Sequence, residues 1–262
     1  MEFNFEATKF ERAWTQEALA DFHADGWFTD VLYRVKGGKE ANVYCCRADP
    51  DEVGYPLVAA KVYRHRGQRS MKNYSAYRTG RTQTRDKRLL RAIKKKSRTG
   101  KETEDSAWID HEFGTMEQLW GMGADVPKPL AMGPNAIIME YIGNEDYAAP
   151  LLQEIDLEPG EAGPLFEALI DNVERLLACD LVHGDLSPFN VLYWEGRATL
   201  IDFPQAVDPM GNPNAFAMLV RDLERLCQYF GRFGVETHGM KLAEDLWKRY
   251  MKGGFRGVFS GT

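Results

Sequence analysis

The most constraining feature of the chain is a pair of short apolar runs, Val191–Trp194 and Ala198–Ile201, on either side of a Glu-Gly-Arg turn. This pattern predicts a β-hairpin. A carboxylate and an amide, Asp185 and Asn190, precede the hairpin, and a second carboxylate, Asp202, directly follows it. Because closing a hairpin returns the chain to its starting edge, we expect Asp202 to lie beside Asn190.

Paired oxygen ligands of this kind suit a nucleotide-bound metal ion. Mg²⁺ is commonly held by one or two protein oxygens plus phosphate oxygens, and Asn190 with Asp202 meets that demand. Asp185 then serves to accept a proton from the attacking group or to orient it. A loop Asp near a hairpin is often only a turn former, but the spacing of the whole set favours phosphoryl transfer.

The sequence of this region resembles that of a known superfamily. His-x-Asp-x-x-x-x-Asn, followed by an Asp after a short hairpin, is similar to the catalytic loop and metal Asp of protein-kinase-like enzymes. The stretches 183–190 and 201–207 resemble the RIO kinases, which are atypical serine kinases and ATPases. The resemblance covers roughly Leu32 to Val235. It implies ATP and Mg²⁺ (Mn²⁺ as the alternative ion) as cofactors, Asn190 and Asp202 as metal ligands, and four catalytic residues: Lys61, Asp185, Asn190 and Asp202.

A glycine-containing loop spans Gly37 to Tyr44. Its glycines let backbone N–H groups turn toward an anion, and Lys39 adds positive charge. Gly-Gly is also a common hairpin turn, so this pattern alone leaves both interpretations open. In its position it resembles the RIO phosphate loop, which implies ATP contacts from Gly38, Lys39, Glu40, Ala41 and Val43.

Lys61 lies inside the apolar strand Leu57–Tyr63, where an unpaired charge is costly. A helix predicted from about Asp105 to Trp120 carries Glu112 on its buried stripe. We therefore expect a Lys61–Glu112 ion pair, which matches the Lys–Glu pair of the superfamily. Both residues are predicted to contribute to ATP binding.

The apolar strand Ala136–Met139 runs into Glu140-Tyr141-Ile142-Gly143, which resembles the hinge between kinase lobes. That resemblance implies adenine contacts from the main chain of Glu140 and Ile142. It also implies apolar contacts from Ala59, Met139, Leu192 and Ile201.

Two further residues are expected to support the loop. His183 is predicted to be structural, packing and bonding to backbone. Asp222 lies on a predicted helix from Ala215 to Phe230 and, by resemblance, caps catalytic-loop amides. Pro204 fixes its own φ and removes a donor where many kinases have Gly, which disfavours a mobile activation switch.

The net charge of −6 conceals a basic block, since Arg64 to Lys101 contains fifteen Lys or Arg and one acid. The block either faces phosphate or is a solvated loop. In RIO kinases the equivalent region is a flexible loop with autophosphorylation sites, and these proteins are linked with the small ribosomal subunit. RNA or that subunit is therefore a candidate partner, and the candidate phosphorylation sites are Ser70, Ser75, Ser97 and Ser106.

Composition is that of an ordinary soluble protein, with 44% hydrophobic and 27% charged residues. No apolar run approaches the roughly 18 residues that span a bilayer, and the N-terminus lacks signal-peptide character. The spacing of the four cysteines disfavours zinc and predicts reduced thiols. We expect a cytoplasmic protein without a membrane partner.

The expected fold is α+β and two-lobed, similar to protein kinases, without an extended activation segment. The N-lobe combines an antiparallel sheet with one main helix, and the small C-lobe is mostly helical. We predict an N-terminal helical segment over 1–30, the N-lobe over 31–139 with a basic flexible loop at about 64–104, and the C-lobe over 140–262. Together they form a single RIO-like kinase domain.

The function that these residues favour is ATP- and Mg²⁺-dependent phosphoryl transfer by a RIO-like serine/threonine kinase. It acts on a protein substrate or on itself, or as an ATPase switch in which Asp202 takes up the phosphoryl group. One alternative is a small-molecule kinase of the aminoglycoside or choline kinase type, which usually has Gly where Pro204 stands. A further possibility is a nucleotide-gated factor that binds RNA or ribosomes.

Overall fold

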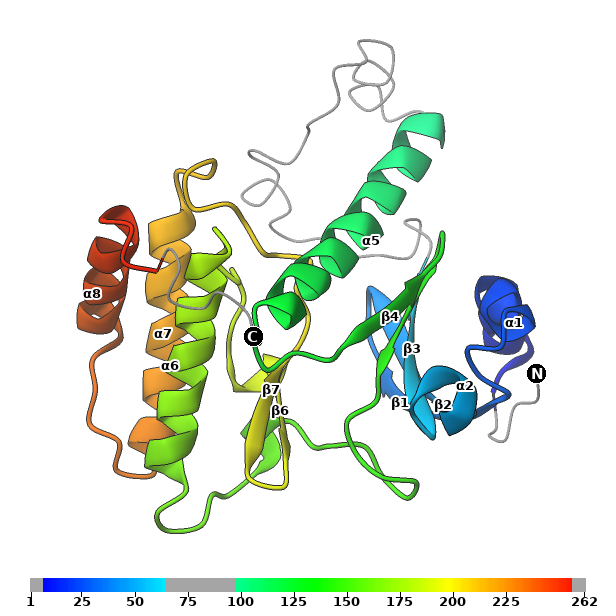
Figure 1. The fold of residues 1–262 in the computed structure, drawn as a ribbon, viewed down its shortest axis with the longest axis horizontal. Helices are drawn as coiled ribbons and strands as arrows, with labels where there is room; N and C mark the ends of the chain where they lie inside the picture. Colours follow the sequence, from blue (N-terminus) through cyan, green and yellow to red (C-terminus); the bar gives the residue numbers. More distant parts are fainter. Residues whose placement is uncertain (1–6, 65–97, 256–262) are drawn as a thin grey trace. The chain divides into compact units, whose positions relative to one another are not determined.

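The computed structural model describes residues 7–64 and 98–255 (Figure 1). These residues fall into two compact units. The first comprises residues 7–64, 98–114 and 128–148, and the second comprises residues 115–127 and 149–255.

The first unit is built on a five-stranded antiparallel sheet of order β1-β2-β3-β5-β4. Its strands are β1 (Asp30–Gly37), β2 (Ala41–Arg47), β3 (Leu57–Tyr63), β4 (Pro129–Met132) and β5 (Ala136–Glu140). The predicted apolar strands Leu57–Tyr63 and Ala136–Met139 are confirmed as β3 and β5. No strand was predicted at Pro129, whereas Pro129 begins β4. Proline is tolerated there because β4 is an edge strand.

Both faces of this sheet are covered by helices of the same unit. Because side chains alternate along a strand, Tyr44, Val58 and Ile138 share one face, where they pack with Leu19 and Phe22 of α1 (Lys9–Ala24). On the opposite face a second cluster joins the sheet to α5 (Arg98–Gly121), and its buried members are Ala41, Tyr63, Ile109 and Ile137. The short helix α2 (Pro50–Val53) connects β2 to β3.

Helix α1 is attached to the sheet by a shared carboxylate. Thr8 caps the helix, its Oγ1 accepting from the Glu11 N–H at 3.1 Å. Glu11 Oε1 accepts from Arg34 Nη1 at 3.0 Å, from the Tyr44 hydroxyl at 2.9 Å and from Asn42 Nδ2 at 3.4 Å. The helix expected within residues 1–30 is α1, and Glu11 ties it to β1 and β2.

The start of α5 differs from expectation. The predicted helix began near Asp105, but α5 begins at Arg98, so residues 98–104 are helical rather than part of a loop. Residues 98–104 include Arg, Lys and Glu, which favour helix, so the helix begins before its first apolar residue. The candidate phosphorylation sites Ser70, Ser75 and Ser97 lie outside the described residues, as does nearly all of the basic block.

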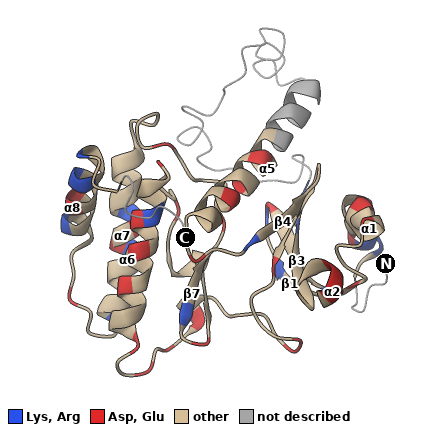
Figure 2. Cartoon of the chain, viewed as in Figure 1, with Lys and Arg blue, Asp and Glu red and all other residues tan. Residues whose placement is uncertain are grey.

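The second unit is mostly helical, with α6 (Ala162–Ala178), α7 (Ala215–Gly231) and α8 (Gly239–Met251). Acidic and basic residues occur along these helices (Figure 2). Their buried side is formed by Leu169, Leu176, Leu223 and Phe230. The predicted hairpin is confirmed as β6 (Val191–Trp194) and β7 (Arg197–Leu200). Its second strand ends one residue earlier than expected, so Ile201 belongs to the following loop. The 3-10 turns η2 (Leu152–Glu154) and η3 (Pro188–Asn190) complete this unit.

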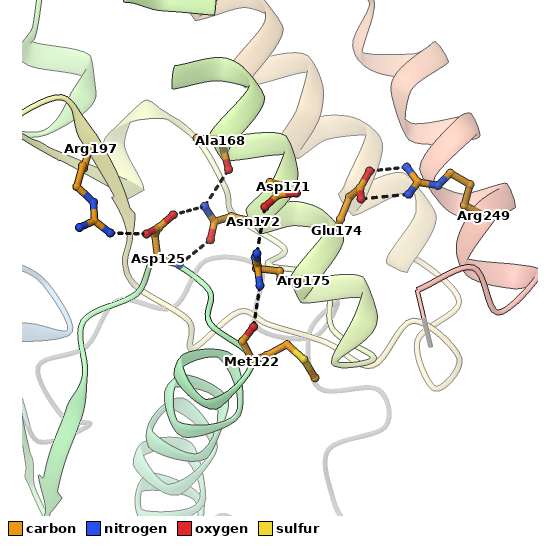
Figure 3. A network of polar contacts seen from close by, with 9 residues as sticks. All are labelled: Met122, Asp125, Ala168, Asp171, Asn172, Glu174, Arg175, Arg197 and Arg249. Carbon is orange, nitrogen blue, oxygen red and sulfur yellow. Dashed lines mark hydrogen bonds and ion pairs between the residues drawn. The ribbon is translucent and has the colours of Figure 1, made fainter. Parts of the chain in front are cut away.

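A polar network holds the segment after α5 against α6 and β7 (Figure 3). Asn172 on α6 is its centre: its Oδ1 accepts from the Asp125 N–H at 2.6 Å, and its Nδ2 donates to Asp125 Oδ2 at 2.9 Å. Arg175 donates to the Met122 carbonyl at 2.8 Å, and Arg197 donates to Asp125 at 3.1 Å. These bonds satisfy the backbone of an irregular segment that would otherwise lack partners.

No helix within 7–64 and 98–255 combines the length and apolarity needed to cross a membrane. All four cysteines are buried free thiols, at Cys45, Cys46, Cys179 and Cys227. Among the described residues, no group of three or more His, Cys, Asp or Glu side chains is arranged to hold a metal ion.

Candidate active site

The predicted phosphate loop is a tight hairpin turn between β1 and β2. The Gly38 N–H donates to the Ala41 carbonyl at 2.9 Å, which leaves Lys39 and Glu40 at the tip. A Cβ at position 38 would lie 2.8 Å from the Ala41 oxygen, so only glycine allows this closure. Lys39 is exposed at the tip. The loop is thus a hairpin turn, and its contact with phosphate stays a prediction.

The expected ion pair between β3 and α5 is confirmed. Lys61 Nζ lies 2.5 Å from Glu112 Oε1, with side chains 12% and 1% exposed. The other carboxylate oxygen, Oε2, accepts from the Tyr63 hydroxyl at 2.6 Å. Tyr63 was not predicted, although its position two residues after Lys61 places it on the same strand face. A buried carboxylate with two donors on opposite oxygens fixes the position of the lysine.

Three of the predicted ATP-binding residues of the first unit share one sheet face. Val43, Ala59 and Met139 pack in a cluster with buried Cys45 and Tyr141. Burial raises the pKa of Cys45 to about 11, so this thiol is neutral and unreactive at ordinary pH.

Two features of this face were not predicted. The hydroxyls of Tyr33 and Tyr141 lie 2.5 Å apart, which adds a polar edge to the apolar face. The Glu140 N–H donates to the Lys128 carbonyl at 2.8 Å and is therefore already bonded. The adenine contact predicted for the Glu140 main chain would then have to use its carbonyl. Ile142 follows two residues later in the segment after β5.

In the second unit, the residues around Asp185 are held by their neighbours. Gly184 has φ +78°, and a Cβ there would lie 2.5 Å from the Gln205 carbonyl oxygen, so glycine is required. His183 is buried, its Nδ1 accepts from the Asp185 N–H at 3.3 Å, and its Nε2 lies 3.2 Å from the Ile201 carbonyl. Burial lowers the pKa of His183, which therefore acts as a neutral structural group, as predicted.

The two predicted metal ligands are brought together by the hairpin. The Ile201 N–H donates to the Asn190 carbonyl at 3.0 Å. Asp202 is the next residue after Ile201, so its backbone lies near that of Asn190. The Asn190 amide nitrogen donates to the Asp185 carbonyl at 2.9 Å, which identifies the other end of the amide as oxygen. Asp202 has φ +73°, a conformation that costs energy for a residue with a side chain.

This donor set fits Mg²⁺. One amide oxygen and one carboxylate are too few for a cage made only of protein, in agreement with the absence of larger clusters among the described residues. They are enough for an ion that takes its remaining ligands from phosphate and water. Leu192 and Ile201, predicted beneath the adenine, are half-buried residues on either side of the hairpin, and Leu192 pairs with Leu151.

Helix α7 contacts the catalytic loop through three polar side chains. Asp222 Oδ2 accepts from the Gly184 N–H at 2.8 Å, which confirms the predicted cap. Arg221 donates to the Gly184 carbonyl, and Arg225 Nη1 donates to Asp185 Oδ1 at 2.8 Å. Burial raises the pKa of Asp222 to about 7, while the charge of Arg221 opposes the rise. Sequence reasoning missed both arginines, and the available signal was their spacing of four residues, which puts them with Asp222 on one side of the helix.

An antiparallel sheet with a buried Lys–Glu pair, joined in one chain to a helical unit with this loop and hairpin, defines the class: a protein-kinase-like phosphotransferase. Within that class, residues 42–243 match the family model of the RIO domain. The chain therefore belongs to the RIO family.

Its curated relatives agree with this assignment. The chain is 31% identical over 245 residues to the RIO-type serine/threonine-protein kinase Rio1 of Haloferax volcanii, covering 93% of this chain and 77% of that protein. It is 26% identical over 203 residues to serine/threonine-protein kinase RIO1 of Caenorhabditis elegans, covering 77% of this chain but 37% of that protein.

Solved structures show the same fold. The chain resembles the crystal structure of the Rio2 kinase-ADP/Mg²⁺-phosphoaspartate complex from Chaetomium thermophilum, with a TM-score of 0.64 and 20% identity. This match covers 98% of this chain and 77% of that chain. It supports the predicted α+β, kinase-like architecture.

Proposed function

We propose that this RIO-family chain transfers the γ-phosphoryl group of ATP to serine or threonine hydroxyls, on a protein substrate or on itself. The observation that carries the proposal is the backbone bond from the Ile201 N–H to the Asn190 carbonyl at 3.0 Å, because it supports a site shared by Asn190 and the next residue, Asp202. The names of the Rio1 and RIO1 relatives, which are serine/threonine-protein kinases, support the same activity.

Each candidate residue has a distinct role in this proposal. Lys61, held by Glu112, would orient the phosphates of ATP, and the Gly38 turn with Lys39 would approach them through backbone N–H groups. Asn190 and Asp202 would hold Mg²⁺, which neutralises the charge of the phosphates when bound. Asp185 would orient the acceptor hydroxyl and accept its proton.

A second candidate function is suggested by the Rio2 kinase, whose solved complex with ADP and Mg²⁺ contains a phosphoaspartate. In this second candidate function, a carboxylate oxygen of Asp202 in the present chain attacks the γ-phosphorus of ATP. The bond between that phosphorus and the β–γ bridging oxygen breaks, and ADP leaves. Water then hydrolyses the acyl phosphate and regenerates the carboxylate, which makes the chain an ATPase switch. Label that hydroxylamine releases supports this candidate, whereas acid-stable phosphoserine alone contradicts it.

A small-molecule kinase and an RNA- or ribosome-binding factor have less support. The small-molecule kinase is disfavoured because the family model matches the RIO domain. An RNA- or ribosome-binding role would depend on the basic block, nearly all of which lies outside the described residues. Binding that weakens steeply with salt and survives Asp185→Asn would favour such a role.

The proposal is tested by incubating the chain with γ-labelled ATP, Mg²⁺ and a basic acceptor protein. We expect label on the protein with wild type and its loss with Lys61→Ala and with Asp202→Ala. Turnover equal to wild type in both variants would contradict the proposal, and labelling of amino alcohols instead of protein would favour the small-molecule kinase.

A further inference from the structure

The catalytic loop itself contains no cation. Asp185 and Asn190 are separated by four uncharged residues: Leu186, Ser187, Pro188 and Phe189. Phosphoryl transfer concentrates negative charge at the reacting centre, and enzymes of this class place cationic side chains there. Any cationic side chain near Asp185 therefore comes from elsewhere in the chain.

In the second unit, Arg225 supplies that charge from 40 residues further along the sequence. Its Nη1 donates to Asp185 Oδ1 at 2.8 Å. The structure gives Asp185 Oδ2 no hydrogen-bond partner among the described residues. One oxygen of the carboxylate is thus fixed by the guanidinium, and the other remains available to a hydroxyl group.

The pair is accessible to a substrate, because the side chains of Arg225 and Asp185 are 39% and 44% exposed. Ion pairs this exposed contribute little to folding stability. The main consequence of the contact is therefore the orientation of the Asp185 carboxylate.

The support for Arg225 is rigid. Helix α7 is anchored by Leu223, Leu226 and Phe230, each 0% exposed. One turn before Arg225, Arg221 and Asp222 bind the carbonyl and N–H of Gly184. The same helix therefore holds the main chain of the loop at Gly184 and its side chain at Asp185.

We propose that Arg225 is a positioning residue for phosphoryl transfer: it fixes one oxygen of Asp185 so that the other faces the acceptor hydroxyl. This inference rests on the proposed function. Arginine suits the role because its guanidinium stays protonated and presents directed donors, whereas a lysine ammonium is a less directional point charge.

The test compares Arg225→Gln and Arg225→Lys with the matched control Arg197→Gln, whose arginine is 80% exposed and pairs with Asp125. Single-turnover phosphate transfer is measured with enzyme in excess, together with ATP affinity and thermal unfolding. We expect Arg225→Gln to lower the transfer rate about tenfold or more, because small misplacement of a catalytic group has effects of that size. Arg225→Lys should recover part of the rate, and ATP affinity should stay within about twofold of wild type.

Asp185→Asn and the double variant Asp185→Asn/Arg225→Gln separate positioning from folding. If Arg225 acts through Asp185, the double variant transfers phosphate at the rate of Asp185→Asn alone. Rates for Arg225→Gln equal to those of Arg197→Gln would overturn the inference, as would a further loss in the double variant or a loss that follows reduced ATP affinity or thermal stability. Wild-type activity in Asp185→Asn would instead overturn the proposed function.

Discussion

The hydroxyl of Tyr63 donates to Glu112 Oε2 at 2.6 Å, while the other oxygen of the same carboxylate binds Lys61 at 2.5 Å. The ion pair of this fold is therefore part of a three-residue arrangement in which the tyrosine occupies the oxygen that the lysine does not use. Removing any one member leaves a buried polar group with fewer partners.

Tyr63→Phe should lower the free energy of unfolding by about 1 kcal/mol and weaken ATP binding, because Glu112 loses one of its two side-chain donors. Urea denaturation and nucleotide titration measure the two effects. Tyr55→Phe is the matched control, since the Tyr55 hydroxyl makes no hydrogen bond to the described residues and should change neither quantity. Equal behaviour of the two variants would show that the tyrosine does not hold Glu112.

Glu112→Gln should be more damaging, because it removes the negative charge that lies 2.5 Å from the Lys61 ammonium, whose side chain is only 12% exposed. Breaking a buried pair in this way costs about 3–5 kcal/mol. Denaturant unfolding of the variant checks this. A loss below about 1 kcal/mol would mean that water or another group compensates the lysine.

Gly184→Ala and Gly196→Ala form a pair that separates backbone strain from crowding. Both glycines have φ +78°, but a Cβ at Gly184 lies 2.5 Å from the Gln205 oxygen, whereas nothing lies within 4 Å of one at Gly196. Gly196→Ala should cost about 1–2 kcal/mol from its left-handed conformation alone. Gly184→Ala should cost more and abolish phosphate transfer, because the loop must shift. Comparable stability and activity in both would contradict the close approach of Gln205.

Asp222 should make stability depend on pH. Its folded-state pKa is raised to about 7 from an ordinary value near 3.8, so between these values the folded chain binds the proton and the unfolded chain does not. The contribution of Asp222 to the free energy of unfolding is therefore fully present below the unfolded-state pKa. It is lost as pH rises through about 7, by up to about 1.4 kcal/mol per pH unit. The lowered pKa of His183 acts in the opposite direction, so the measured quantity is the difference between wild type and Asp222→Asn. That variant should lose this decline between pH 5 and 7, and an unchanged slope would contradict the assignment.

Glu11→Gln should loosen α1 from the sheet. The Glu11 carboxylate accepts from Arg34, Asn42 and Tyr44, and a neutral amide accepts these bonds more weakly. We expect a loss of about 1–2 kcal/mol in denaturant unfolding. Glu17→Gln on the exposed side of the same helix is the control, and an equal loss there would show that helix charge rather than the network is responsible.

Local patterns predicted the elements and contacts that depend on nearby residues. Alternation located β3, and the spacing of Asp185, Asn190 and Asp202 around a hairpin located the loop and its closure. Lys61 and Glu112 could be paired because each is a charge in an apolar pattern and requires the other.

The contacts that were missed join residues whose patterns give no reason to pair. The sequence pattern predicts Arg225 as an ordinary exposed residue of an amphipathic helix. Only the packing of α7 brings its side chain to Asp185. Tyr63 reads as an apolar strand residue until Glu112 is placed opposite it. The edge strand that begins at Pro129 was not predicted, because proline in a short segment favours a connector over a strand.

The central claim is that Lys61 and Asp202 act on the same ATP and its Mg²⁺. A double-mutant cycle tests it most directly: single-turnover phosphate transfer is measured in wild type, Lys61→Ala, Asp202→Ala and the double variant. Residues that act as a unit are strongly non-additive, so we expect the double variant to be about as slow as the slower single variant. Losses that multiply, or transfer at the wild-type rate in either single variant, would contradict the claim.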